Sequence, residues 1–134
     1  MSADTPPDQK RRIYESLVYN LLYAPPPEGF AQAQRYAQDY LTNPANPPSP
    51  KLWADLAAAY GQEYASRKQQ GESLDRLKIV RDNALHAVKE ALRLEPRLKG
   101  YLRDMWQQSE FKSSEAENDL EAFKDDADFK ALLE

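Results

Sequence analysis

The chain has 134 residues, of which 41% are hydrophobic, and this is the size and composition of one folded domain with a core of its own. Lys and Arg total 18 against 22 Asp and Glu, so the formal net charge is −4. This small negative net charge argues against a protein whose main role is to bind nucleic acid or anionic lipid.

Cysteine is absent from the sequence, which excludes a disulfide framework, a Cys-based zinc site and a thiol nucleophile. The longest apolar stretches are only a few residues long, so we expect no membrane-spanning helix. The first residues, Met1 to Pro7, lack the basic and apolar blocks of a secretory signal. These features predict a cytoplasmic protein that does not bind a membrane.

Prolines divide the chain into helical segments. All but one of the ten prolines lie in the first 50 residues, and no run of β-branched residues alternates with period two, so strands are not expected. The spacing predicts helices over 8–23, with Asp8 as N-cap, and over 28–41, which pair as an antiparallel hairpin over 8–43. The first helix carries apolar residues at helical spacing, namely Ile13, Leu17, Val18, Leu21 and Leu22.

A second, longer hairpin is predicted over 49–96. Ser49-Pro50 is a strong start signal, because serine is a favoured N-cap and proline suits the first helical position. Apolar residues recur at helical spacing to about residue 70, Gly71 breaks the pattern, and a further helix follows over 72–94. We expect Trp53 to lie in the core between these two helices.

The remaining segment, 97–134, is predicted to close the domain. A short helix is expected over 97–108, followed by a polar tether over 109–118. The end of the chain is too apolar for a free tail, so we expect it to dock on the long hairpin as a cap, with Asp126 as the N-cap of a last helix. Its apolar residues are Leu120, Phe123, Phe129, Leu132 and Leu133.

Charge is unevenly distributed along the chain. Residues 61–108 carry ten basic and seven acidic side chains, whereas residues 109–134 carry three and nine. One interpretation is that both segments simply present solvated faces. The other is that an acidic tail folds back on the basic helices or engages a basic partner.

The long hairpin also carries a pattern in which the bulky residues of one helix meet the alanines of the next. The pattern is Trp53-x2-Leu56-Ala57-x2-Tyr60, then Ala84-x3-Val88-x2-Ala91, then Pro96. It resembles the signature of the tetratricopeptide repeat (TPR). The segment between the two halves is longer than is usual in that family, which both helices can absorb by lengthening together around Gly71.

The end of the sequence strengthens this resemblance. Ala91-Leu-Arg-Leu-Glu-Pro96, together with the stretch from Asp119 to Leu133, looks like the terminal cap of bacterial TPR proteins. The resemblance implies a single all-α domain of antiparallel helical hairpins in a TPR-like right-handed arrangement, with 8–43 as a degenerate first hairpin. A generic bundle of four or five helices is the alternative.

Residue types that support catalysis or metal binding are sparse. His86 is the single histidine, and its helical position predicts a solvated side chain. The acidic run from Asp125 to Asp128 lacks the glycine and the glutamate of a calcium loop and is better placed to cap a helix. No glycine-rich phosphate loop occurs. We therefore expect no enzymatic activity, no metal site and no cofactor.

The resemblance implies a non-catalytic protein–protein interaction module, or adaptor, that presents a helical groove to a peptide or a helix. By helical position, this groove is expected to be lined by Lys51, Ala54, Ala58, Gly61 and Gln62. Tyrosines at i,i+4 spacing add large amphipathic contact side chains, and the partner-binding candidates among them are Tyr19, Tyr23 and Tyr64, whereas Tyr40 and Tyr60 are expected in the core.

The expected partner is a protein or peptide and not a nucleic acid, and the chain itself is expected to be a monomer or a weak homo-oligomer. The alternative function is a small regulatory or inhibitory protein, immunity- or antitoxin-like, that acts through its acidic C-terminal segment. Salt dependence separates the two, because binding to an alanine- and tyrosine-lined groove responds little to ionic strength, whereas binding through an acidic tail weakens steeply.

Overall fold

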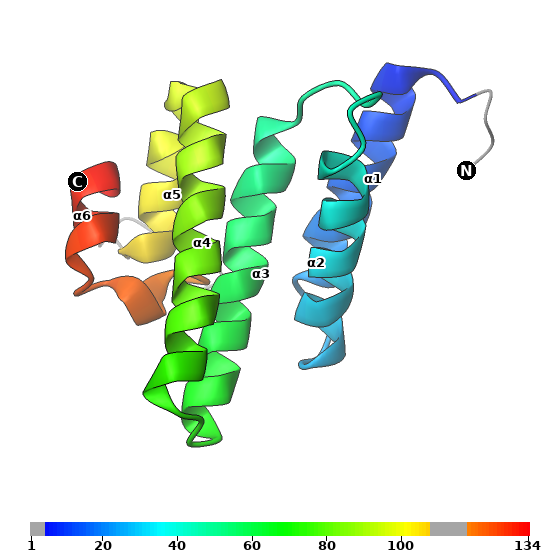
Figure 1. The fold of residues 1–134 in the computed structure, drawn as a ribbon. Coiled ribbons are helices and arrows are strands. Elements are labelled where there is room, and N and C mark those ends of the chain that lie inside the picture. The colour runs from blue at the N-terminus through cyan, green and yellow to red at the C-terminus, as the bar shows by residue number, and fades with distance from the viewer. Residues whose placement is uncertain (1–4, 108–117) are drawn as a thin grey trace.

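The computed structural model describes residues 5–107 and 118–134, and every element within these two ranges is helical (Figure 1). The predicted all-α class is thus confirmed for the described residues. The TPR-like arrangement and the division into 8–43, 49–96 and 97–134 stay predictions. No helix in these ranges has the length and apolarity needed to cross a bilayer.

The first hairpin pairs α1, Pro7–Leu21, with α2, Glu28–Leu41. The predicted bounds of α2 are confirmed, but the predicted N-cap of α1 is wrong. Pro6 occupies the N-cap position, and Asp8 lies inside the first turn, because Pro7 has the fixed φ that suits the first helical residue. Within α1, Val18 is buried.

Only part of the apolar stripe on α1 faces the core. Val18 and the C-cap residue Leu22 are buried, whereas Ile13 and Leu17 are exposed. The two pairs lie on different sides of the helix, and α2 and α3 pack against only one of them. The side of α1 that carries Val18 and Leu22 is therefore the side that faces the core.

The second hairpin pairs α3, Pro50–Gln69, with α4, Leu74–Leu94. The predicted start of α3 is confirmed, since the Ser49 hydroxyl accepts a hydrogen bond from the Leu52 amide at 3.2 Å. The two helices run antiparallel side by side, at the centre of the molecule (Figure 1). Gly71 allows the tight reversal between them, because its φ of +79° is a conformation that side-chain-bearing residues avoid.

The C-terminal part of the chain lies on the opposite side of α3 and α4 from the first hairpin (Figure 1). The helix predicted over 97–108 is divided into a 3₁₀ turn, Pro96–Leu98, and α5, Lys99–Trp106. After residue 118 a second 3₁₀ turn, Glu121–Phe123, leads to α6, Ala127–Leu133. The predicted tether over 109–118 falls outside the described residues except for Asn118.

Asp126 confirms the prediction that it caps the last helix. Its carboxylate accepts hydrogen bonds from the amides of Asp128 and Phe129, at 2.9 and 3.4 Å. The predicted docking of the chain end is also confirmed, since Leu120, Phe123, Phe129 and Leu133 are all buried in the same core as the long hairpin.

The two tryptophans differ in burial. Trp53 is only half-buried, with its ring edge-to-face on exposed His86 at 5.6 Å between centroids, whereas Trp106 is fully buried. The Trp106 Nε1–H donates a 2.7 Å hydrogen bond to the carbonyl of Phe123. The expectation that Trp53 fills the core is thus only partly met, and Trp106 is the tryptophan that fills it.

We expect Trp106→Ala to lower the free energy of unfolding by about 3–5 kcal/mol and Trp53→Ala by about half as much, because the cost of truncation follows the buried area that is lost. Urea unfolding of both variants beside the wild type measures the difference. Equal losses in the two variants would contradict the difference in burial.

Candidate functional site

The middle helix, α3, presents two opposite stripes of side chains to its surroundings. The stripe that the sequence predicts as a partner-binding groove consists of Lys51, Ala54, Ala58, Gly61 and Gln62, and we call it the closed face. The opposite stripe, which we call the open face, consists of Trp53, Tyr60, Glu63 and Arg67. Both follow from the helical repeat, which brings residues three, four and seven apart to the same side.

The closed face is covered along most of its length. Ala54 and Ala58 are fully buried, so their side chains offer no surface to a partner in this arrangement. Near the other end of the stripe, the main chain at Asp119 lies directly on Gly61. A Cβ atom at Gly61 would stand 1.9 Å from the Asp119 carbonyl oxygen, so only glycine fits there. The space that the sequence predicts as a groove is occupied by the protein itself.

Two further candidates hold the C-terminal segment in place. The Gln62 side-chain amide donates to the Leu22 carbonyl at 2.9 Å and to the Asp119 carboxylate at 3.1 Å. The Tyr64 ring packs on the Phe123 ring, with 4.7 Å between centroids. Both side chains therefore have a structural role in the folded chain.

The remaining candidates meet at one end of the closed face. Tyr19 of α1, Tyr23 just after that helix, Lys51 of α3 and Tyr101 of α5 lie together, and we call this group the tyrosine rim. The Lys51 ammonium stands 4.8 Å from the centre of the Tyr19 ring and 5.1 Å from that of the Tyr101 ring. Both distances allow an attraction between the cation and the ring faces. Three helices distant in sequence thus contribute to one surface.

A buried carboxylate, that of Asp55, holds two residues of the rim in place. Asp55 is fully buried, and its two oxygens contact the Lys51 ammonium at 3.3 Å and the Tyr101 hydroxyl at 2.9 Å. A buried charge needs such partners, because desolvation without them is costly. The sequence reasoning missed Asp55, although a carboxylate inside the apolar run Leu52–Tyr60, four residues after a lysine, is a readable signal.

Tyr19 and Tyr23 form the exposed end of the rim. Their hydroxyl oxygens are 3.0 Å apart, and their rings meet edge to face with 5.3 Å between centroids. Tyr23 is 58% exposed, an unusual fraction for a large aromatic side chain. This end of the rim is open to a partner.

The open face borders a second accessible region, between α2 and α4. Two adjoining depressions of about 420 and 410 Å³ share Gln34, Glu63 and Arg67 in their linings. Glu63 and Arg67 line both depressions, with an ion pair of 2.6 Å between them. We call the region the α2/α4 groove. The sequence reasoning did not identify it.

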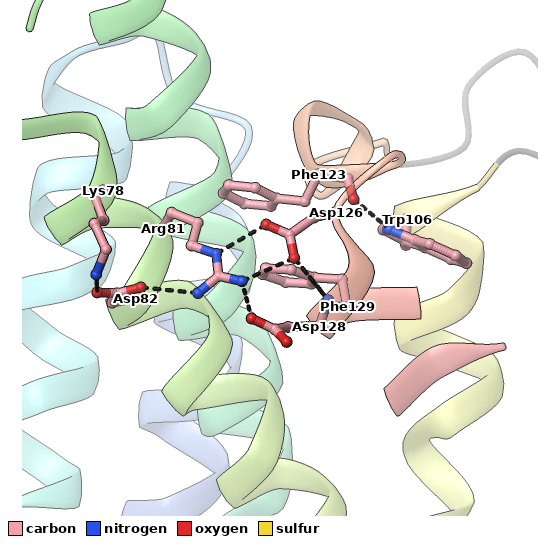
Figure 2. A network of polar contacts seen from close by, with 8 residues as sticks. All are labelled: Lys78, Arg81, Asp82, Trp106, Phe123, Asp126, Asp128 and Phe129. Atoms are coloured by element: carbon pink, nitrogen blue, oxygen red, sulfur yellow. Dashed lines mark hydrogen bonds and ion pairs between the residues drawn. The ribbon is translucent and has the colours of Figure 1, made fainter. Parts of the chain in front are cut away.

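A cluster of charged residues attaches the C-terminal segment to α4 (Figure 2). The Arg81 guanidinium donates to the two oxygens of Asp126 at 2.8 and 2.9 Å, and it also contacts Asp128 and Asp82. Lys78 pairs with the other side of Asp82 at 2.8 Å. Two carboxylates of the acidic C-terminal segment are therefore engaged within the molecule.

Stacked aromatic rings lie beside this cluster (Figure 2). The rings of Phe123 and Phe129 are 4.5 Å apart and nearly parallel, and the main chain of Phe123 accepts the Trp106 hydrogen bond. The segment is thus held by apolar packing on one side and by Arg81 on the other.

The contact between Arg81 and Asp126 makes the stability of the folded protein depend on pH. Hydrogen bonding to Arg81 holds the pKa of Asp126 below its usual value. A carboxyl group with a lowered pKa in the folded state contributes its full stabilisation at neutral pH and loses it as pH falls below about 3.9.

We expect Arg81→Gln to lower the free energy of unfolding by about 1.5–3 kcal/mol at pH 7, the usual value for hydrogen bonds to charged groups. The loss should be smaller at about pH 2.5 than at pH 7, because the stabilisation that Asp126 gives through Arg81 declines as pH falls below about 3.9. Urea unfolding at the two pH values tests this. The matched control is Arg93→Gln, which removes an exposed pair with Glu90, and its effect should be small at both pH values. Equal losses for Arg81→Gln at both pH values would contradict the assignment.

Within residues 5–107 and 118–134, no group of three or more His, Cys, Asp or Glu side chains is placed to hold a metal ion. His86 is exposed, as predicted, and its described ring contact is with Trp53. The predicted core positions of Tyr40 and Tyr60 are confirmed, and burial raises the pKa of both hydroxyls.

Comparison with known proteins adds no relative. The chain matches no protein-family model, no curated protein and no solved structure.

Proposed function

We propose that this chain is a non-catalytic interaction module that binds a peptide or a helix of another protein at the tyrosine rim. The observation that carries the proposal is the exposed Tyr19–Tyr23 pair beside Lys51, held in place by a fully buried carboxylate. Tyrosine is enriched where proteins bind each other, because it buries much area and keeps a polar tip. The tetratricopeptide-like motif from Trp53 to Pro96 supports the same function.

The rim is suited to binding that responds little to salt. The charge of Lys51 is offset by Asp55 at 3.3 Å, so the net charge of the surface is small, and its contact area comes from aromatic rings. The alternative of an acidic tail acting on a partner is less favoured, since Asp126 and Asp128 already pair with Arg81.

The test is affinity capture from the native cell with the wild type, Tyr23→Ala and Ile13→Ala as baits, each at low and high salt. Ile13 is the matched control, because it is an exposed apolar residue of α1, the helix that ends just before Tyr23, and lies outside the rim. We expect Tyr23→Ala to lose the specific partner at both salt concentrations and Ile13→Ala to keep it. A partner that Tyr23→Ala retains, or that high salt alone removes, would contradict binding at the rim.

A further inference from the structure

We propose that two copies of this chain assemble by exchanging their C-terminal segments, so that residues 118–134 of one copy dock on the other. The receiving surface, which we call the segment site, consists of Gly61, Gln62, Tyr64, Arg81 and Trp106. None of these residues belongs to the tyrosine rim, so the proposal goes beyond binding at the rim. It stands on the contacts that the structure shows within one copy.

The C-terminal segment is held by buried anchors and by main-chain hydrogen bonds. Leu120, Phe123 and Leu133 are buried in the common core. The Phe123 carbonyl accepts from Trp106 at 2.7 Å, and the Leu133 carbonyl accepts from the Arg103 side chain at 2.8 Å. Large apolar anchors in fully desolvated positions carry most of the free energy at interfaces between proteins. The same contacts would therefore hold the segment of a second copy.

Shape and charge decide which chain can dock there. Gly61 leaves room for the main chain at Asp119, because a Cβ atom would stand 1.9 Å from the Asp119 carbonyl oxygen. Arg81 donates to both oxygens of Asp126 at 2.8 and 2.9 Å and also contacts Asp128. A partner must present main chain, two carboxylates and the buried anchors in this order. A second copy of the chain meets this requirement, since it carries the identical segment.

The segment brings part of its own structure with it. The Asp126 carboxylate caps α6 by accepting from the amides of Asp128 and Phe129, and the Phe123 and Phe129 rings stack with 4.5 Å between centroids. All of these groups lie within the segment. They stay together when it docks on a different copy, and the segment is then recognised as one unit.

The covalent connection is long enough for exchange. Residues 108–117 join the two described ranges. An extended chain spans at most about 3.3–3.6 Å per residue, so Gln107 and Asn118 can stand up to roughly 35 Å apart. The 20 residues of α3, by comparison, measure about 30 Å at 1.5 Å per residue. The segment can therefore reach the surface of a neighbouring copy.

Exchange replaces each contact within a copy by the same contact between copies, which is why it is a low-cost route to a dimer. The copy's own segment competes, at an effective concentration of about millimolar for a short connection. The exchanged form is therefore expected at high protein concentration, or where a copy's own segment docks poorly.

The test mixes two full-length variants whose defects lie on opposite sides of the contact. Arg81→Glu damages the segment site and keeps the segment, whereas Phe129→Ala damages the segment and keeps the site. Fluorescently labelled Arg81→Glu is titrated with Phe129→Ala, anisotropy gives the Kd, and native mass spectrometry gives the mass. We expect a 1:1 complex at least about tenfold tighter than either variant forms with itself, because only the mixture pairs an intact site with an intact segment. An unlabelled peptide of residues 118–134 should displace the labelled chain.

The matched control replaces Arg81→Glu by Arg93→Glu, which reverses an exposed arginine of the same helix outside the segment site. Its segment stays docked on its own intact site, so its complex with Phe129→Ala should be at least about tenfold weaker. Asp126→Asn, which keeps a capping side chain, takes the place of Phe129→Ala if that variant does not fold.

The proposal is overturned if the mixture binds no more tightly than each variant binds itself, if Arg93→Glu binds as tightly as Arg81→Glu, or if the peptide displaces nothing. Tyr23→Ala, introduced into both chains, should leave the Kd of the mixture within about twofold, as expected of a side chain outside the interface. Loss of rim binding therefore leaves the exchange standing, and the two proposals fail separately.

Discussion

A chain that lacks residues 119–134 should self-associate and unfold far more readily than the intact chain. Leu120, Phe123, Phe129 and Leu133 are buried in the common core, and each contributes about 1.5–3 kcal/mol of burial before the entropy of ordering is subtracted. Together they amount to much of the stability of a domain of this size. Their loss also uncovers Trp106, which then has no acceptor for its Nε1–H.

Light scattering at several protein concentrations measures the self-association, and a thermal melt measures the stability. The matched control removes Glu134 alone, whose exposed pair with Lys130 at 3.6 Å contributes little. A shortened chain that stays monomeric and melts like the intact one would show that the segment is a partner-binding tail and not part of the core.

The positions of the helices could be predicted because their ends are encoded locally. Ser49, Gly71 and Asp126 each act within three residues of their own position, through a cap or a positive φ. The predicted ends of α2, α3 and α4 are accordingly within two residues of the observed ones. The N-cap of α1 failed because two adjacent prolines offered more than one possible start.

Which side of a helix is buried proved harder to predict than where the helix lies. In α1 both Leu17 and Val18 are apolar, and the choice between their two sides depends on which helix packs there. The same difficulty, of predicting which side of a helix is buried, affected the prediction of the partner-binding groove. Ala54 and Ala58 are small, and small residues are compatible both with an open groove and with close packing. Here the close packing is observed.

Contacts between distant parts of the sequence were the least predictable. Arg81 and Asp126 are separated by 45 positions, and Tyr101 and Asp55 by 46. The distribution of charge along the sequence gave partial information, since the basic stretch 61–108 precedes the acidic stretch 109–134. Folding back of the acidic segment on the basic helices was one of the two interpretations left open. Only the packing of the chain end on α4 selects that pairing over the others.

Gly61→Ala should destabilise the protein, although alanine is normally the better helix former. A glycine inside a helix costs about 1 kcal/mol relative to alanine, so the substitution should be favourable unless something occupies the space of the methyl group. At Gly61 the occupant is main chain, since the new Cβ would lie 1.9 Å from the Asp119 carbonyl oxygen and 2.9 Å from its carbonyl carbon. The C-terminal segment has to retreat, which weakens the Gln62–Asp119 hydrogen bond and the burial of Leu120.

We expect a net loss of about 1–3 kcal/mol for Gly61→Ala, the usual range for an overpacked site. Gly100→Ala is the matched control, because Gly100 is also helical and a Cβ there meets no atom within 4 Å. That variant should be unchanged or more stable by up to about 1 kcal/mol. Urea unfolding of the two variants beside the wild type gives the comparison. If Gly61→Ala matches Gly100→Ala, the main chain at Asp119 does not lie against α3, and the Gly61 end of the closed face is then accessible to a partner.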